Sequence, residues 1–299
     1  MTALATSRAR GFAALALTLS AACWGSATVM TKAVLAELPP FLTLALQLGA
    51  SVAALWAATL LVGLRPRLGP LERRAALSGL LEPGLAYGVG VPGLVLTSAA
   101  NAAVIGAAEP AVIVLLGWLL WRRPVGPALA AAVAATMAGV ALITLTGADV
   151  DGASLLGDAM ILAGVMLAAL YVLASSRFVA AVHPLPLAAL QQSVGLVAAL
   201  ALLALARAAG MEAAPTAIPP AVAAAAMASG VVQYALAFWL DLVGLRVYPA
   251  GEAGLFLALT PVFGVAAAAA FLGETVAPAQ ATGAALVIGA LVWMARRGP

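Results

Sequence analysis

The chain has 299 residues, of which 65% are hydrophobic and only 8% are charged. Soluble proteins carry about 25% charged residues, so this composition excludes a large water-exposed domain and indicates an integral membrane protein. The single cysteine, Cys23, excludes an internal disulfide, and the single histidine, His183, argues against histidine-based metal or hydrolase chemistry. The formal net charge of +3 comes from loop arginines, and no basic cluster with interleaved aromatic residues indicates nucleic-acid binding.

The first segment combines Arg8 and Arg10 with an apolar run, a pattern that a signal leader shares. Hydrophobicity continues through Trp24 to about residue 36, however, and further apolar stretches follow. We therefore expect an uncleaved first helix.

About 20 apolar residues cross the hydrocarbon core of a membrane, and helices are the plausible spanning form at this hydrophobicity. The sequence predicts an all-α integral membrane protein with ten transmembrane helices. These predicted spans cover residues 11–35, 41–63, 75–95, 99–121, 128–146, 155–176, 186–206, 219–240, 248–271 and 279–295.

The second half of the sequence repeats the first. Gln47 aligns with Gln192 at an offset of 145, and an offset of 151 is shared by Gly79 with Gly230, Pro110 with Pro261 and Pro127 with Pro278. Each half carries five predicted spans, and an odd number makes the second copy enter the membrane from the opposite side. We expect two inverted five-helix repeats, residues 1–150 and 151–299, an architecture typical of secondary transporters.

The basic residues predict the orientation. If the N-terminus is cytoplasmic, 12 of the 14 lysines and arginines fall inside, and only Lys32 and Arg207 fall outside. Both termini are then cytoplasmic. The alanine-rich composition, the short loops and the absence of an N-glycosylation sequon fit a bacterial inner membrane.

Two glutamates lie within predicted spans, and each precedes a proline. Glu82 is followed by Pro83 and Glu109 by Pro110. An acidic residue at a membrane helix centre costs about 2.5 to 3.5 kcal/mol, so it needs a reason to be there. One reading is a proton or cationic-substrate site at a helix kink. The other is a permanently protonated glutamate that is hydrogen-bonded to a nearby carbonyl.

Polar residues at helical spacing form stripes on several spans. A stripe of this kind lines a cavity or joins helices through hydrogen bonds. Tyr87 lies about 140° from Glu82 around a helix, so we do not expect both to face the same lumen. Asn101 and its repeat partner Glu252 lie near opposite ends of their spans, as gates or as polar helix ends. The predicted substrate-binding or cavity-lining residues are Trp24, Thr28, Gln47, Glu82, Tyr87, Asn101, Glu109, Tyr171, Gln192, Gln233 and Glu252.

Several short motifs occur in a characteristic order. They are Cys23-Trp24-Gly25, then Lys32, Glu109-Pro110, Thr260-Pro261, Leu272-Gly273-Glu274 and the segment from Gly283 to Gly289. With ten spans in two repeats, the chain resembles the drug/metabolite transporter superfamily in its EamA-type exporter branch, and most of all bacterial amino-acid exporters of the YddG type. The first repeat departs from the pattern, because Trp121-Arg122-Arg123 stands where the second has Leu-Gly-Glu.

This resemblance implies a secondary transporter that exports amino acids or related small metabolites with broad selectivity, without a cofactor or metal. We expect alternating access by rocking of one repeat against the other, with bending at Pro83, Pro92, Pro110 and Pro261. Facilitated diffusion and proton exchange through Glu109 or Glu82 both stay open, as does the oligomeric state. The expected partners are a small-molecule substrate and the lipid bilayer.

Two other functions compete with this one. An exporter of drugs or quaternary ammonium compounds would use Trp24 for a cation–π contact and Glu109 for charge. An intramembrane enzyme is the remote alternative, because the sequence has no H-E-x-x-H or G-x-S-x-G motif.

Overall fold

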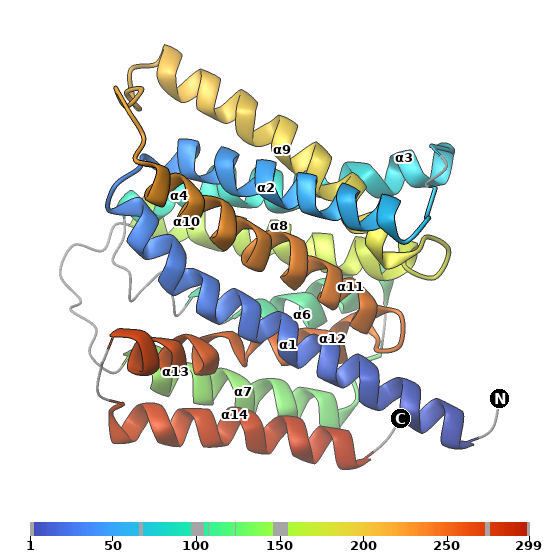
Figure 1. Ribbon diagram of the computed structural model, residues 1–299. Helices are drawn as coiled ribbons and strands as arrows, with labels where there is room; N and C mark the ends of the chain where they lie inside the picture. The colour runs from blue at the N-terminus through green and yellow to red at the C-terminus, as the bar shows by residue number, and fades with distance from the viewer. Residues whose placement is uncertain are drawn as a thin grey trace.

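The computed structural model describes residues 3–65, 68–96, 105–106, 108–122, 124–145, 155–272 and 276–297. All regular elements within these ranges are helices, as the composition predicts, and they lie side by side in one bundle (Figure 1). The start of α1 and the end of α14 lie at the same end of this bundle, which is called the terminal end below (Figure 1).

The helices of the first half are long at its beginning and short in its middle. They are α1 (Ala3–Leu35), α2 (Pro40–Leu61), α3 (Pro70–Leu77), η1 (Ser78–Leu80), η2 (Leu81–Leu85), α4 (Ala86–Leu96), α6 (Glu109–Trp121) and α7 (Pro127–Leu145). The second half has α8 (Leu155–Phe178), α9 (Pro184–Ala208), α10 (Pro220–Gly230), η3 (Val231–Leu236), α11 (Ala237–Leu245), α12 (Ala250–Leu257), α13 (Thr260–Leu272) and α14 (Pro278–Arg297). Proline begins many of them, because its fixed φ suits the first turn and its missing N–H is not needed there.

Six helical stretches of the described chain are long and apolar enough to cross a membrane. They are Arg8–Leu35, Pro40–Leu61, Leu155–Phe178, Pro184–Ala208, Pro220–Leu245 and Ala250–Ala267. Three shorter apolar helices, Glu109–Trp121, Pro127–Ile143 and Pro278–Met294, overlap three other predicted spans. The chain is therefore a multi-pass membrane protein by length and composition, and the count of ten spans stays a prediction.

The contacts between helices are reciprocal between the two halves. α2 packs on α9 and α7 on α14, and in both cases the partners hold the same place in their repeats. α4 packs on α8 as α11 packs on α1, and α6 packs on α8 as α13 packs on α1. α1 and α8 run in opposite directions along the bundle (Figure 1). The repeat found in the sequence is therefore also a repeat of packing.

The same contacts show that the two repeats are interleaved. α1 and α2 pack with α10, η3, α11 and α13 of the other half, and these six elements form what we call the first bundle. α8 and α9 pack with α3, η1, η2, α4 and α6, which together form the second bundle. Each bundle thus takes helices from both repeats.

A buried glutamine joins the two repeats within each bundle. In the first bundle, the Gln47 side-chain amide on α2 donates hydrogen bonds to Thr31 Oγ1 (2.8 Å) on α1 and to Ser229 Oγ (2.9 Å) on α10. In the second bundle, Gln191 on α9 donates to Ser175 Oγ (2.9 Å) on α8 and Ser78 Oγ (2.7 Å) on η1.

These bonds correct the pairing that the sequence indicates for Gln47. Its repeat partner is Gln191, one residue before Gln192, because Gln191 makes the equivalent hydrogen bonds. The helix starts at Pro40 and Pro184 have the same spacing as Gln47 and Gln191. The error arose because Gln191 and Gln192 are adjacent and their residue type cannot distinguish them.

A glycine makes each of these joints close-packed. A Cβ atom on Gly230 would contact the backbone of Gln47, and one on Gly79 would contact the backbone of Gln191. Because backbone atoms cannot turn aside as a flexible side chain can, these positions admit no larger residue without a shift of the helices.

Replacing Gly230 by alanine is therefore expected to destabilise the protein. Overpacking of this kind costs about 1–3 kcal/mol, so the Tm in detergent should fall. Gly49→Ala is the matched control on α2, since its Cβ would have nothing within 4 Å. Equal melting temperatures for the two variants would contradict this account of the joint.

Candidate functional site

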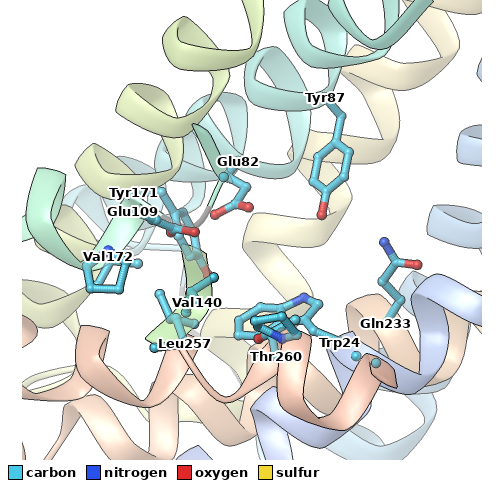
Figure 2. A pocket seen from close by; sticks show the side chains of 16 residues that line it. Trp24, Glu82, Tyr87, Glu109, Val140, Tyr171, Val172, Gln233, Leu257 and Thr260 are labelled. Atoms are coloured by element: carbon cyan, nitrogen blue, oxygen red, sulfur yellow. The ribbon is translucent and has the colours of Figure 1, made fainter. Parts of the chain in front are cut away.

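The interleaved bundles enclose a cavity of about 550 Å³. Its walls come from both bundles and from α7 and α12, so it lies where the two repeats meet. The lining residues are Trp24, Gly25, Glu82, Tyr87, Gly106, Glu109, Pro110, Val140, Tyr171, Val172, Gln233, Leu257, Ala258, Thr260, Pro261 and Gly264. Figure 2 shows the side chains of Glu82, Glu109, Tyr87 and Trp24 directed toward this common space.

Glu82 reaches the cavity because its helix is broken. A proline clashes with helical geometry at the residue before it and pushes that residue toward an extended conformation. Glu82, which precedes Pro83, has φ −145° and ψ 130° between η1 and α4. The predicted span 75–95 is therefore a series of short helical pieces, and the break presents the carboxyl group to the cavity.

Glu109 reaches the cavity at the start of a helix. The sequence predicts a continuous span over residues 99–121, but α6 begins at Glu109, after Ala108. Pro110 lies in the first turn of α6, where proline is tolerated, and not at a kink inside a helix. A carboxylate in the first helical turn is also favoured by the positive end of the helix dipole.

The second repeat has the corresponding break at Thr260. α12 ends at Leu257 and α13 begins at Thr260, with Pro261 as its second residue. Thr260 is the repeat partner of Glu109 at the offset of 151 found in the sequence. The two repeats thus place a carboxyl group and a hydroxyl group at equivalent helix starts. The fourth predicted bending residue, Pro92, lies inside α4.

Three aromatic residues, Trp24, Tyr87 and Tyr171, contribute to the wall. Phe238, which is 1% exposed, contacts the ring of Trp24 at 5.2 Å between centroids, that of Tyr171 at 5.5 Å and that of Tyr234 at 6.1 Å. Tyr87 contacts Tyr234 edge-on at 5.6 Å. Phe238 and Tyr234, which do not line the cavity themselves, thus join the three lining rings into one packed set.

Two polar residues of the wall are tied to the glutamine joints. The Tyr171 hydroxyl donates a hydrogen bond to Gln191 Oε1 (3.0 Å). Gln233 Oε1 accepts one from Thr31 Oγ1 (2.8 Å), the same hydroxyl that Gln47 contacts. Each bundle thus holds one cavity side chain in place through its joint.

Tyr87 and Glu82 line the same cavity although an ideal helix would separate them by about 140°. That angle holds only if the chain turns by 100° at each residue from Glu82 to Tyr87. The backbone at Glu82 is extended and the turns of η2 are wider, so the angle between the two side chains differs from the ideal value.

The structure places three predicted cavity residues elsewhere. Gln47 is buried in its joint, where its amide nitrogen already has two acceptors. Gln192 is 0% exposed on α9, and neither side-chain amide atom has a hydrogen-bond partner in the described chain. Glu252 lies in the first turn of α12, with Oε2 3.5 Å from Arg10 Nη2. The side chain of Thr28 and the whole of Asn101 lie outside the described residues.

The sequence did not indicate several wall residues. Val140, Val172 and Leu257 are apolar residues in apolar spans, and nothing in the sequence separates them from lipid-facing neighbours. Phe238 is hidden for the same reason. Asp241 lies one residue beyond the predicted span 219–240 and was not considered, whereas α11 continues to Leu245.

The cavity combines acidic and aromatic chemistry. Its ionisable lining residues are two glutamates and two tyrosines, and the lining set contains no lysine, arginine or histidine. In the part of the chain that the structure describes, no three histidine, cysteine or acidic side chains converge as metal ligands. The arrangement suits a small organic group that carries a positive charge and an apolar part.

Phe238 is expected to hold the aromatic wall together. Loss of a buried phenylalanine side chain costs about 3–5 kcal/mol, so Phe238→Ala should lower the Tm and weaken the near-ultraviolet circular dichroism of the packed rings. Phe12 is 65% exposed on α1 and supplies the control variant Phe12→Ala. Unchanged near-ultraviolet signal in Phe238→Ala would count against a rigid wall.

The comparisons with known proteins agree with this fold. Residues 11–145 and residues 155–296 each match the EamA-like transporter family. A solved structure titled only as the crystal structure of a protein matches with a TM-score of 0.79 and 22% sequence identity, over 95% of this chain and 98% of that one. That likeness supports the fold alone. No protein with a curated description matches the chain.

Proposed function

We propose that this chain exports amino acids or similar small amine-bearing metabolites. It belongs to the EamA-like transporter family and is therefore a membrane transporter of the drug/metabolite transporter superfamily. The observation that supports this substrate class most directly is the pair of carboxyl groups, Glu82 and Glu109, on a cavity whose other walls are mostly apolar, with aromatic rings and the hydroxyl group of Thr260 among them. The motif likeness to YddG-type amino-acid exporters points the same way.

Each part of an amino acid has a partner in this cavity. The ammonium group is held by Glu82 and Glu109, and the side chain lies against Trp24 and its neighbouring rings. The substrate carboxylate is held at the start of α13, where the helix dipole is positive and Thr260 adds a hydroxyl. Half-helix starts of this kind hold substrate carboxylates in other secondary transporters.

The selectivity of such a site is broad. A cavity of about 550 Å³ has the volume of a small-molecule site, and most of its wall is apolar. The polar groups fix the ends of the substrate, while the ring wall accepts apolar parts of different shape.

Organic cations, including quaternary ammonium drugs, are the second candidate class. The specific observation in their favour is the absence of a basic side chain among the lining residues, so the cavity offers no ion-pair partner to a substrate carboxylate. Trp24 would supply a cation–π contact and Glu109 the counter-charge.

Alternating access follows the bundles more naturally than the repeats. The sequence suggested that one repeat rocks against the other. Because each glutamine joint fastens helices of both repeats together, we propose that the first and second bundles are the rocking units. The breaks at Glu82, Glu109 and Thr260 lie between them and allow the cavity to open on alternate sides.

The arrangement of basic residues supports the proposed orientation. Arg122 follows α6, Arg177 lies in the last turn of α8, Arg246 follows α11 and Arg296 lies near the end of α14. These helix ends all lie at the terminal end of the bundle (Figure 1). We propose that this end faces the cytoplasm, as the positive-inside rule requires, in an inner membrane crossed ten times by repeats 1–150 and 151–299.

Arg10 closes the terminal end in this conformation. Its guanidinium contacts Glu252 of α12 and lies 4.9 Å from the ring centroid of Tyr248, whose hydroxyl donates to the Arg10 carbonyl (3.4 Å). These contacts join α1 to the beginning of α12. Opening toward this end requires that they separate.

Arg10→Gln should therefore favour the conformation that opens at the terminal end. Removing a partly exposed ion pair shifts the equilibrium by up to about 1 kcal/mol, or about fivefold. The measurement is the labelling rate of Thr260→Cys, in a Cys23→Ala background, by a membrane-impermeant maleimide applied from that side. Arg8→Gln is the control, since Arg8 is exposed on the same helix. Equal labelling rates in the two variants would rule out a closing role for Arg10.

The test of the proposed function is counterflow of radiolabelled leucine and threonine into liposomes that hold the purified protein. Saturable counterflow is expected, and Glu109→Gln should reduce it at least about tenfold, because the ammonium group loses a charged partner. Glu37→Gln, at an exposed loop position, should leave it unchanged.

Counterflow of tetraethylammonium without counterflow of either amino acid would favour the second candidate class. Transport of neither probe, or full activity in Glu109→Gln, would contradict the proposed site.

A further inference from the structure

Asp241 is a buried acidic residue that the cavity does not use. It lies on α11 and is 2% exposed, and its Oδ2 atom has no hydrogen-bond partner in the described chain. A charged residue within a membrane protein is costly and generally marks a functional position. Its environment therefore decides what it could do.

The contacts of Ala237 and Gly244, which lie on either side of Asp241 on α11, show which part of α1 is next to Asp241. Four residues earlier, the Ala237 carbonyl accepts a hydrogen bond from Ser20 Oγ (2.7 Å). Three residues later, Gly244 lies against the side chain of Leu17. Positions 237, 241 and 244 share one helix face, so Asp241 lies against α1 between Leu17 and Ser20. The Ser20 hydroxyl already donates elsewhere, and this surface supplies no charge.

In the part of the chain that the structure describes, the basic residues on the elements that pack on α11 lie near helix ends, as does Arg246, which follows α11 itself. On the packed elements, Tyr171 of α8 is an ionisable neighbour of Asp241. On α1 and α12, which also pack on α11, Arg10 and Glu252 are paired with each other near the terminal end. α9 has a single ionisable residue, Arg207 in its last turn, and Arg177 at the end of α8 lies over the ring of Trp121.

Asp241 is nevertheless close to the cavity. Phe238 is one turn earlier on α11, and its ring contacts the cavity residues Trp24 and Tyr171. The Asp241 carboxyl group is near enough to interact electrostatically with Glu82 and with Glu109. It therefore forms a third member of the carboxyl set, behind the aromatic wall.

The position of Asp241 along the bundle indicates which end of the protein it could serve. The first bundle places Gln233 and Trp24 on the cavity, Asp241 beside Leu17 and Ser20, and the Arg10–Glu252 contact at the terminal end. Asp241 is thus between the cavity and the end that Arg10 closes. A metal ion would need ligands that converge, and among the described residues no three acidic, cysteine or histidine side chains do so. A proton needs only one carboxyl group.

We propose that Asp241 carries a proton in the transport cycle and couples substrate movement to proton movement in the opposite direction. This inference rests on the proposed function. When an ammonium group binds between Glu82 and Glu109, one proton leaves the three-carboxyl set for water. When the substrate departs on the other side, one proton is taken up there, so each turnover exchanges one substrate for one proton.

The test separates coupled transport from exchange. Liposomes are prepared one pH unit more acidic inside than outside, with the membrane potential held at zero by potassium and valinomycin. One-for-one exchange across one pH unit supports about tenfold accumulation of radiolabelled leucine, or of tetraethylammonium if that is the probe transported. We expect this accumulation in the wild-type protein and its loss in Asp241→Asn, which should still perform counterflow.

Two variants control the result. Asp241→Glu keeps a titratable carboxyl group and should restore accumulation, whereas Glu37→Gln changes an exposed carboxylate and should behave as wild type. Wild-type counterflow without accumulation would overturn the role of Asp241 and leave the proposed function intact. Accumulation by Asp241→Asn equal to wild type would overturn it as well.

An infrared measurement keeps the proposal testable if no probe is transported or if Asp241→Asn does not fold. The carboxylic-acid carbonyl band of the purified protein is followed between acidic and alkaline buffer. A reversible band that is absent in Asp241→Asn, or shifted in Asp241→Glu, is the expected result. An Asp241 band that is unchanged at every pH would identify a permanently neutral structural residue and refute the proposal.

Discussion

Within the hydrocarbon core of a membrane, every backbone N–H and C=O group must be satisfied by protein or by water in a cavity. A helix can therefore be interrupted only where it faces a protein interior or a water-filled space. In this chain the helices are interrupted at Glu82, Glu109 and Thr260, and all three residues lie on one cavity. The interruptions and the cavity thus depend on each other.

Proline causes the interruptions, and the repeat places them. Pro83, Pro110 and Pro261 each follow the residue that the break exposes. Because the last two are repeat partners, one local rule produces two helix starts on the same cavity. The functional asymmetry of the site lies in the residues before these prolines, a carboxyl group in the first repeat and a hydroxyl group in the second.

Interleaving makes the walls of the site dependent on distant parts of the chain. The Tyr171 hydroxyl is held by Gln191, whose amide also contacts Ser78 of the other half. Gln233 is held by Thr31 in the same manner. The polar wall therefore has few degrees of freedom within a bundle.

The sequence predicted the helical class from hydropathy, the repeat from internal similarity and the two cavity glutamates from the cost of a buried charge. It predicted less where geometry departs from an ideal helix. Tyr87 and Glu82 share a wall only because the backbone at Glu82 is extended.

The remaining errors concern the repeat partner of Gln47 and two residues that the sequence analysis omitted. Gln47 lies in a joint, and its repeat partner is Gln191, a distinction that required the hydrogen bonds. Phe238 was missed because an apolar ring carries no functional signal. Asp241 was missed because the predicted span ended at residue 240, whereas α11 continues to Leu245.

The interleaving also bears on biosynthesis. α1 and α2 leave the ribosome long before α10, η3 and α11, the elements against which their polar faces pack. The Gln47 side-chain amide cannot form its hydrogen bond to Ser229 until Ser229 has been translated. When the first half has been synthesised, its hydrogen-bonded interface is therefore incomplete, and only the second half completes it. Expressed as two polypeptides, the halves would be expected to need each other to fold.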